Sequence, residues 1–188
     1  MNDILTSLRL WIVTLAVCCV LYPGFLWLFG HALVPGSVAG DLIRDAEGRV
    51  IGSRRVAQSF GRPEYFWPRP SAVDYEASAT GGSNLSPTDP RLTESAWEIL
   101  GRLGVDEPVP ADLLSASGSG LDPDVTERAA RIQVSRVAAA RGIDEAVVRD
   151  RIEDIARHAG GIPVGERLVN VLELNLALDA EERMSLRR

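Results

Sequence analysis

The chain has 188 residues, a formal net charge of −6 and twenty basic residues, all of which are arginine. This length accommodates one modest domain and a short extra segment. Because the sequence contains no lysine, it excludes a phosphate-binding loop that ends in Gly-Lys-Ser/Thr and lysine Schiff-base chemistry, and its acidic balance disfavours binding to nucleic acid.

The N-terminal segment is apolar, with no Asp, Glu, Lys or Arg between Arg9 and Asp41. At about 1.5 Å per helical residue, residues 10–34 are long enough to cross a hydrocarbon core about 30 Å thick. A cleaved signal peptide would have an apolar region of only about 7 to 15 residues. Trp27 and Phe29 also stand where an interfacial aromatic belt would. The sequence therefore favours a retained transmembrane helix over a signal peptide.

The charges that flank this helix predict its orientation. Arg9 precedes the helix, whereas the first basic residue after it is Arg44. Because basic residues are retained preferentially on the cytoplasmic side, we expect residues 1–9 to form a cytoplasmic stub. Residues 35–188 would then be a soluble extracytoplasmic domain. The expected location is the cell (inner) membrane, crossed once.

The first part of this domain predicts short strands and a long ordered loop. Apolar runs at residues 50–53 and 56–60 are bounded by glycine and proline, which predicts a small sheet or hairpin. Residues 61–90 contain too many prolines and glycines for a long helix. They also carry a Tyr-Phe-Trp run at 65–67, which predicts a loop pinned by aromatic side chains.

Two amphipathic helices are then predicted from their caps and apolar spacing. Asp89 and the proline that follows it are typical of a helix start, and Gly104 ends the apolar repeat. Thr126 is a suitable N-cap for a second helix that continues to Arg141. Gly142 stands just after its end.

A third helix follows directly, with Asp144 as its N-cap. Ile143 and Val148 occupy the two positions of a hydrophobic staple across that cap. We interpret residues 169–178 as a further helix. Together, these patterns predict an α+β fold class: one transmembrane helix followed by one small α+β domain.

The sequence predicts no catalytic residues and no metal ligands. His31 stands at the membrane edge and His158 stands alone on a predicted helix, so no Ser-His-Asp triad or histidine-rich metal site can form. Cys18 and Cys19 both lie in the apolar segment, so the domain has no thiol for a disulfide. Its carboxylates alternate with arginines, as on a solvated, ion-paired helix face. We expect this chain not to be an enzyme by itself.

Residues 138–148 have the spacing of a DNA-binding helix-turn-helix, with Ala138, Gly142 and Val148 at its small and apolar positions. The same spacing serves any tight helical hairpin. The domain is also acidic and is expected outside the cytoplasm. A membrane-tethered DNA-binding regulator is therefore disfavoured, and we expect no nucleic-acid partner.

Two glycine-rich loops are candidates for anion binding, at residues 80–84 and 117–120. Consecutive glycines let backbone amides converge on an anion without obstruction by Cβ atoms. Neither loop leads directly into a clear helix N-terminus. By composition alone, each loop is more typical of a turn than of a phosphate site.

Several motifs follow the apolar helix in a fixed order along the chain. They are 48–53 (GRVIGS), 65–66 (YF), 69–72 (RPSA), 81–85 (GGSNL), 115–122 (SASGSGLD) and 169–179 (VNVLELNLALD). In this order and at these spacings, they resemble the C subunit of the Kdp-type potassium-transporting P-type ATPase. The resemblance covers nearly the whole chain.

This resemblance implies a non-catalytic accessory subunit of a high-affinity, ATP-driven potassium uptake system. The implied partners are a potassium-channel-like A subunit, an ATP-hydrolysing B subunit and a small F subunit, together with membrane lipid. The C subunit would assist complex assembly and act as a catalytic chaperone that raises the ATP affinity of the B subunit. No tightly bound cofactor is implied, and ATP would be reached through the partner subunit.

The resemblance also implies a nucleotide-binding segment. The family's Gly-Gly-Ser segment is similar to the Leu-Ser-Gly-Gly-Gln signature of ATP-binding cassettes. The nucleotide-binding residues implied here are Thr80, Gly81, Gly82, Ser83 and Asn84. Thr80 keeps the hydroxyl of the signature serine, whereas Ser83 lacks the amide of the signature glutamine.

A rival interpretation is a stand-alone, membrane-anchored nucleotide-binding or sensor module. Such a module would bind its ligand without partners, whereas an accessory subunit would co-purify with larger membrane proteins. If the domain lies outside, it cannot reach cytosolic ATP. Any effect on ATP affinity would then be transmitted through the partner subunits as a coupling free energy.

Overall fold

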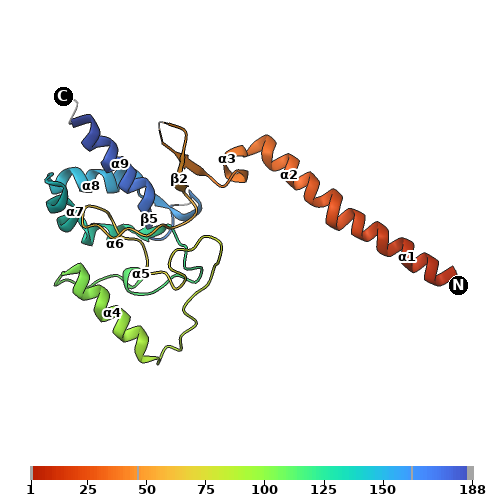
Figure 1. Ribbon diagram of the computed structural model, residues 1–188, viewed down its shortest axis with the longest axis horizontal. Helices are drawn as coiled ribbons and strands as arrows, with labels where there is room; N and C mark the ends of the chain where they lie inside the picture. Colours follow the sequence, from red (N-terminus) through yellow and green to blue (C-terminus); the bar gives the residue numbers. More distant parts are fainter. Residues whose placement is uncertain (1, 46, 162, 186–188) are drawn as a thin grey trace. The chain divides into compact units, whose positions relative to one another are not determined.

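The computed structural model describes residues 2–45, 47–161 and 163–185, and the chain forms two compact units, Met1–Leu42 and Ile43–Arg188. Figure 1 labels their elements in chain order. The first unit holds one long apolar helix, and the second combines helices with short strands. The predicted α+β class with a single N-terminal apolar helix is therefore confirmed.

The N-terminal helix consists of α1 (Asn2–Leu15), the π-helical segment η1 (Ala16–Leu21) and α2 (Tyr22–Leu33). Within it, residues 3–33 are long and apolar enough to cross a membrane by length and composition. The π-helical segment precedes Pro23, which has no N–H and whose ring would clash with a carbonyl of a regular α-helical turn. The widened turn accommodates the proline without ending the helix. The short helix α3 (Pro35–Val38) follows.

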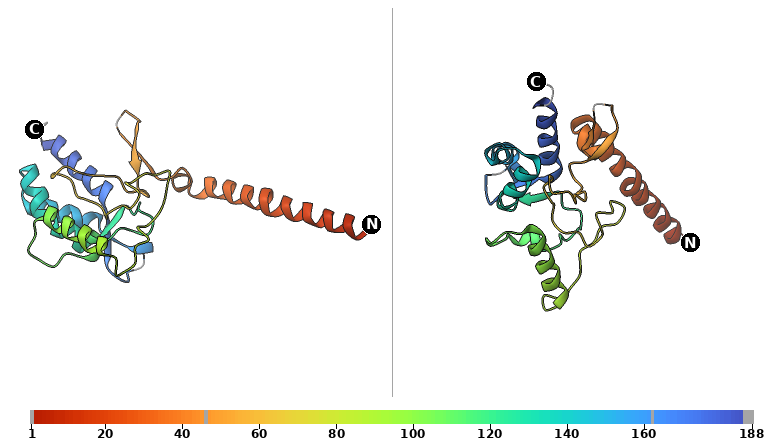
Figure 2. Two further views of the ribbon diagram at one scale, coloured as in Figure 1. Left: turned by 60° about the horizontal axis from the view of Figure 1, so that its bottom comes forward. Right: turned by 60° about the vertical axis from the view of Figure 1, so that its left-hand side comes forward.

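The chain next forms an antiparallel hairpin from β1 (Leu42–Arg44) and β2 (Val50–Ser53). The predicted sheet at 50–53 is confirmed, but its partner is β1 and not residues 56–60. Only an isolated bridge between Ser53 and Val56 remains of that second run. In both views of Figure 2, the hairpin stands apart from the three-stranded sheet.

The centre of the second unit is a small antiparallel sheet in the order β3-β5-β4. Val125 on β3 pairs with Val169 on β5, and both side chains are buried. Helices pack around this pair through Ala129, Ile152 and Leu174, which are also buried. Burial of one such aliphatic side chain contributes about 1.5–3 kcal/mol. The strands are β3 (Asp124–Thr126), β4 (Arg157–His158) and β5 (Arg167–Asn170).

The predicted helix caps are confirmed. Helix α4 (Pro90–Leu103) begins where Asp89 accepts the backbone N–H of Arg91, and it ends at Gly104 with a φ of 62°. Helix α8 (Glu145–Ile155) begins where Asp144 accepts the N–H of Ala146. The remaining helices are α5 (Ala111–Leu114), α6 (Glu127–Ile132), α7 (Val134–Arg141), the 3₁₀ turn η2 (Ala159–Gly161) and α9 (Val171–Ser185).

Two helix predictions need correction. The helix expected from Thr126 to Arg141 is broken at Gln133, whose side chain is buried against the loop at Trp67. The helix expected over residues 169–178 begins two residues later, because Val169 and Asn170 belong to β5. The Asn170 side chain accepts the N–H of Glu173 and so begins α9.

The loop before α4 is ordered by two buried amide side chains. The Phe66 N–H donates to Asn175 Oδ1 at 2.8 Å, and Asn175 Nδ2 donates to the Phe66 carbonyl at 3.1 Å. Gln133 makes the same pair of bonds with the Trp67 backbone, at 2.8 and 3.1 Å. Each amide therefore satisfies the backbone N–H and carbonyl of one buried residue, as a neighbouring strand would. The loop predicted around this aromatic run is confirmed.

Candidate functional site

The two glycine-rich loops, predicted separately, lie against each other in the structure. The Gly81 N–H donates to the Ser119 carbonyl at 2.8 Å. A Cβ at Gly82 would lie 3.2 Å from the Gly118 carbonyl oxygen. A Cβ at Gly120, whose φ is +69°, would lie 2.7 Å from the Gly81 carbonyl oxygen. Gly82 and Gly120 therefore allow the close approach of two backbone segments.

The five implied nucleotide-binding residues are neighbours on the first of these loops. Thr80, Ser83 and Asn84 are exposed, and Asn84 adopts a left-handed backbone conformation with a φ of 52°. Its side-chain amide donates to the Gly82 carbonyl at 3.2 Å. Because the Gly81 N–H is already used, an anion at this loop would meet mainly the hydroxyls of Thr80 and Ser83.

A polar turn formed by residues 69–75 lies next to these loops. Ser71 Oγ accepts the backbone N–H groups of Val73 and Tyr75, and the Tyr75 hydroxyl donates to the Arg69 carbonyl at 2.9 Å. Burial raises the pKa of Tyr75, although the Arg102 charge acts in the opposite direction. The hydroxyl therefore stays protonated and keeps its role as a donor at neutral pH.

Trp67 is contacted by two guanidinium groups. The centre of the Arg136 guanidinium lies 3.7 Å from the ring centroid, and that of Arg102 lies 4.1 Å from it. Burial lowers the pKa of Arg136 to about 10, and the nearby Arg102 charge contributes in the same direction. Arg136 donates hydrogen bonds to the uncharged oxygens of Pro63, Tyr65 and Gln133. These contacts hold the loop that carries Trp67 against Arg102 of α4 and Arg136 of α7.

The histidines lie on separate elements. His31 Nδ1 bonds to the Trp27 carbonyl in α2, and His158 lies in strand β4, not in the helix expected for it. Within residues 2–45, 47–161 and 163–185, no group of three or more His, Cys, Asp or Glu side chains is arranged to hold a metal ion. Residues 138–148 comprise the end of α7, the connection at residues 142–144 and the start of α8, with Ala138 and Val148 buried in the core.

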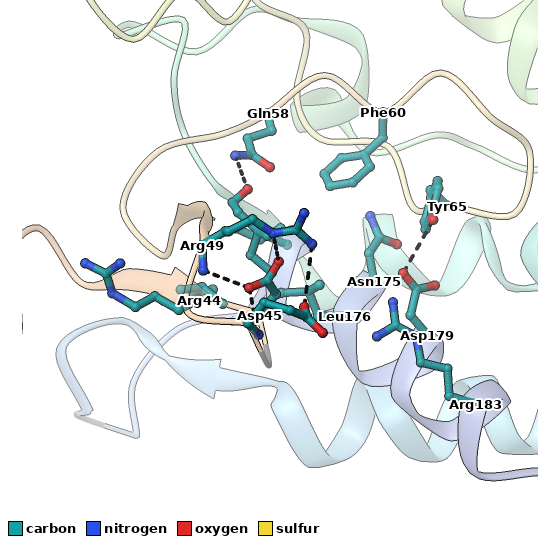
Figure 3. A pocket seen from close by; sticks show the side chains of 14 residues that line it. Arg44, Asp45, Arg49, Gln58, Phe60, Tyr65, Asn175, Leu176, Asp179 and Arg183 are labelled. Atoms are coloured by element: carbon teal, nitrogen blue, oxygen red, sulfur yellow. Dashed lines mark hydrogen bonds and ion pairs between the residues drawn. The ribbon is translucent and has the colours of Figure 1, made fainter. Parts of the chain in front are cut away.

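A cavity of about 690 Å³ lies between the β1–β2 hairpin and α9 (Figure 3). Its apolar walls include Ile43 and Ile51 from the hairpin, Phe60, and Leu176 from α9. The cavity is not evident from the sequence motifs, because it joins residues that are more than a hundred positions apart.

Comparisons with known proteins agree along the whole chain. The family model described as KdpC, the c chain of K⁺-transporting ATPase, matches residues 4–180. The potassium-transporting ATPase KdpC subunit of Parvibaculum lavamentivorans is 48% identical over 184 residues, which cover 97% of this chain and 98% of the relative. KdpC subunits of Burkholderia mallei and Burkholderia pseudomallei are 44% identical over 182 residues, covering 91% of this chain and 92% of each relative. The chain therefore belongs to the KdpC family of potassium-transporting ATPase subunits.

Proposed function

We propose that this chain is a non-catalytic accessory subunit of an ATP-driven potassium uptake pump, anchored by residues 10–34 and acting through residues 35–188. The observation that carries the proposal is the exposed helix at residues 3–33, which belongs to a chain of the KdpC family. None of the side chains described in its apolar window is buried. An apolar surface of this length requires lipid or partner helices around it.

The proposed orientation places the N-terminus in the cytoplasm and the bulk of the chain outside it. It is supported by Arg9 in the N-terminal part of the helix and by the lack of a lysine or a further arginine between that position and Arg44. The proposed location is the cell (inner) membrane. The proposed partners are the channel-like A subunit, the ATP-hydrolysing B subunit and the small F subunit.

The proposed effect on ATP affinity is indirect. The engaged N–H of Gly81 reduces the number of backbone donors that residues 80–84 can offer to a phosphate. With the domain outside, this subunit would assist assembly and raise the ATP affinity of the B subunit through contacts with its partners. The alternative is direct contact of ATP with Thr80 or Ser83.

Cysteine labelling in intact cells tests the orientation. In a background with Cys18→Ala and Cys19→Ala, we would introduce either Ser95→Cys on exposed α4 or Ser7→Cys before the apolar segment. A membrane-impermeant maleimide should label Ser95→Cys in intact cells and Ser7→Cys only after lysis. The reverse pattern would refute the outward domain and favour direct nucleotide contact.

Steady-state ATPase assays on the assembled complex test the coupling. Thr80→Ala combined with Ser83→Ala should leave the KM for ATP within about twofold of the parent, because neither hydroxyl touches ATP. A rise of roughly tenfold in KM with unchanged assembly would instead assign nucleotide contact to this loop. Loss of this subunit from the complex should raise the KM for ATP in either case.

A further inference from the structure

The β1–β2 hairpin concentrates exposed apolar side chains on the second unit. Val50 and Ile51 of β2 are 48% and 36% exposed. Because successive strand residues face opposite sides, these two side chains lie on opposite faces of the hairpin, and of the two only Ile51 lines the cavity. Elsewhere in the part of the second unit that the structure describes, the large exposed apolar side chains are scattered singly over Trp97, Ile143, Val164 and Met184. Exposed apolar side chains gathered on one small element mark an interaction site more often than isolated residues do.

This hairpin is also incomplete as a structural element. It has two strands of three and four residues, and it does not join the β3-β5-β4 sheet. Two-stranded hairpins are marginally stable in water unless another element covers them. One point of cover is Gly52, where a Cβ would approach Leu172 Cδ2 of α9 to 2.7 Å. The hairpin therefore rests on α9 at its glycine and leaves its apolar side chains for another partner.

Between the hairpin and α9 lies the cavity of about 690 Å³ (Figure 3). Its acidic side chains already have partners. Asp45 accepts from Arg49 Nε at 2.7 Å. Asp179 accepts from the buried Arg141 guanidinium at 2.8 Å and from the Tyr65 hydroxyl at 3.4 Å. The third acidic residue of the lining, Glu47, lies 3.5 Å from Arg49 Nη2, so Asp45 and Glu47 share one guanidinium.

Two arginines of the cavity differ from the other charged groups. Arg44 on the hairpin donates to the backbone carbonyl of Gly48 at 2.9 Å, and Arg183 projects from α9. Among the described residues, neither is paired with a carboxylate. Figure 3 shows them at opposite ends of the cavity lining. Apolar walls with an unneutralised guanidinium at each end are complementary to an apolar segment that carries acidic side chains.

The position of the hairpin in the chain restricts the kind of partner. Residues 34–41 connect the apolar helix to β1, and eight residues span at most about 28 Å. A surface tethered this closely to a membrane-spanning helix meets partners that also stand at the membrane. Free soluble proteins have no such restriction.

We propose that the β1–β2 hairpin and the adjacent face of α9 form the docking surface for an apolar, acidic extramembrane segment of a membrane-spanning partner subunit. The segment would place apolar side chains on Ile51 and Leu176 and carboxylates near Arg44 and Arg183. This inference rests on the proposed accessory function and identifies the surface through which it operates.

Photocrosslinking in the assembled complex tests the surface. A p-benzoylphenylalanine residue in place of Ile51, which lines the cavity and is 36% exposed, should form an adduct with an extramembrane segment of a membrane-spanning subunit, identified by mass spectrometry. The matched control carries the same residue in place of Val164, which is 74% exposed elsewhere on the domain and should give no such adduct. An adduct with lipid or with a second copy of this chain, or no adduct at all, would overturn the proposal.

Co-purification of the full-length chain with its partners tests the docking surface and the accessory function separately. The pair Arg44→Glu and Arg183→Glu should reduce partner retention roughly tenfold, whereas Arg128→Glu, at an arginine that also bonds to a backbone carbonyl, should retain it. Ile51→Asp is a second variant of the same surface. Ile51→Asp and the arginine double variant are interpreted only if their unfolding temperatures equal that of the parent chain. Equal retention by all variants refutes the docking surface. Failure of the parent chain to retain any partner refutes the accessory function itself.

Discussion

Asn175 is the side chain whose loss should most directly loosen the loop before α4. It is buried and forms both a donated and an accepted hydrogen bond with the Phe66 backbone. Asn175→Leu preserves most of the side-chain volume but removes both partners. The Phe66 N–H and carbonyl would then be buried without hydrogen bonds, because Phe66 itself is fully buried.

The expected cost follows from these two backbone groups. An unsatisfied buried donor or acceptor costs about 1–3 kcal/mol, so the two groups left by Asn175→Leu should reduce the free energy of unfolding of the domain by roughly 2–6 kcal/mol. Urea denaturation of the full-length chain in uncharged nanodiscs, followed by tryptophan fluorescence, measures this change. The buried Trp67 next to the affected backbone is a suitable reporter.

The matched control is Asn84→Gly, which removes an exposed amide that bonds to the nearby Gly82 carbonyl and suits the left-handed backbone conformation at this position. It should change the free energy of unfolding by less than about 0.5 kcal/mol. If Asn175→Leu were equally mild, the two hydrogen bonds would not stabilise the loop, and the comparison of this amide with a neighbouring strand would be wrong.

Two further predictions concern the glycine contact and the sheet. Gly120→Ala should destabilise the domain by about 1–3 kcal/mol, because its φ is +69° and the new Cβ would meet the Gly81 carbonyl, whereas Gly118→Ala has open space and should be nearly neutral in the same urea assay. Burial raises the pKa of Asp124, with the Asn170 hydrogen bond opposing it, so the folded state favours the protonated form. The stability from this group is present at low pH and is lost as pH rises from about 3.8 through the raised folded pKa. Asp124→Asn should therefore weaken the fall in stability across that interval; an unchanged pH profile would contradict the assignment.

Local capping rules were sufficient for much of the fold. The start of α4 at Asp89 and its end at Gly104 follow from one carboxylate and one glycine, because both satisfy backbone groups of adjacent turns. The same logic gave Asp144 for α8. These interactions span only a few residues, so the sequence contains all of the information they need.

The errors come from contacts between distant parts of the chain. Gln133 lies in a helical pattern, yet its amide bonds to Trp67, which is 66 residues away. Val169 continues an apolar run but pairs with Val125 as a strand. A strand of three or four residues has too few positions to show a period of its own. In the candidate site, each glycine-rich loop was visible, but their mutual contact was not.

The π-helical turn before Pro23 has a consequence for the geometry of the membrane anchor. Each residue of an α-helix turns the chain by about 100°, so a widened turn shifts the angular position of every side chain that follows it. Side chains before Ala16 and after Leu21 therefore do not continue one uniform heptad stripe. The two halves of the anchor present their faces in different directions, and a single straight partner helix could match only one of them.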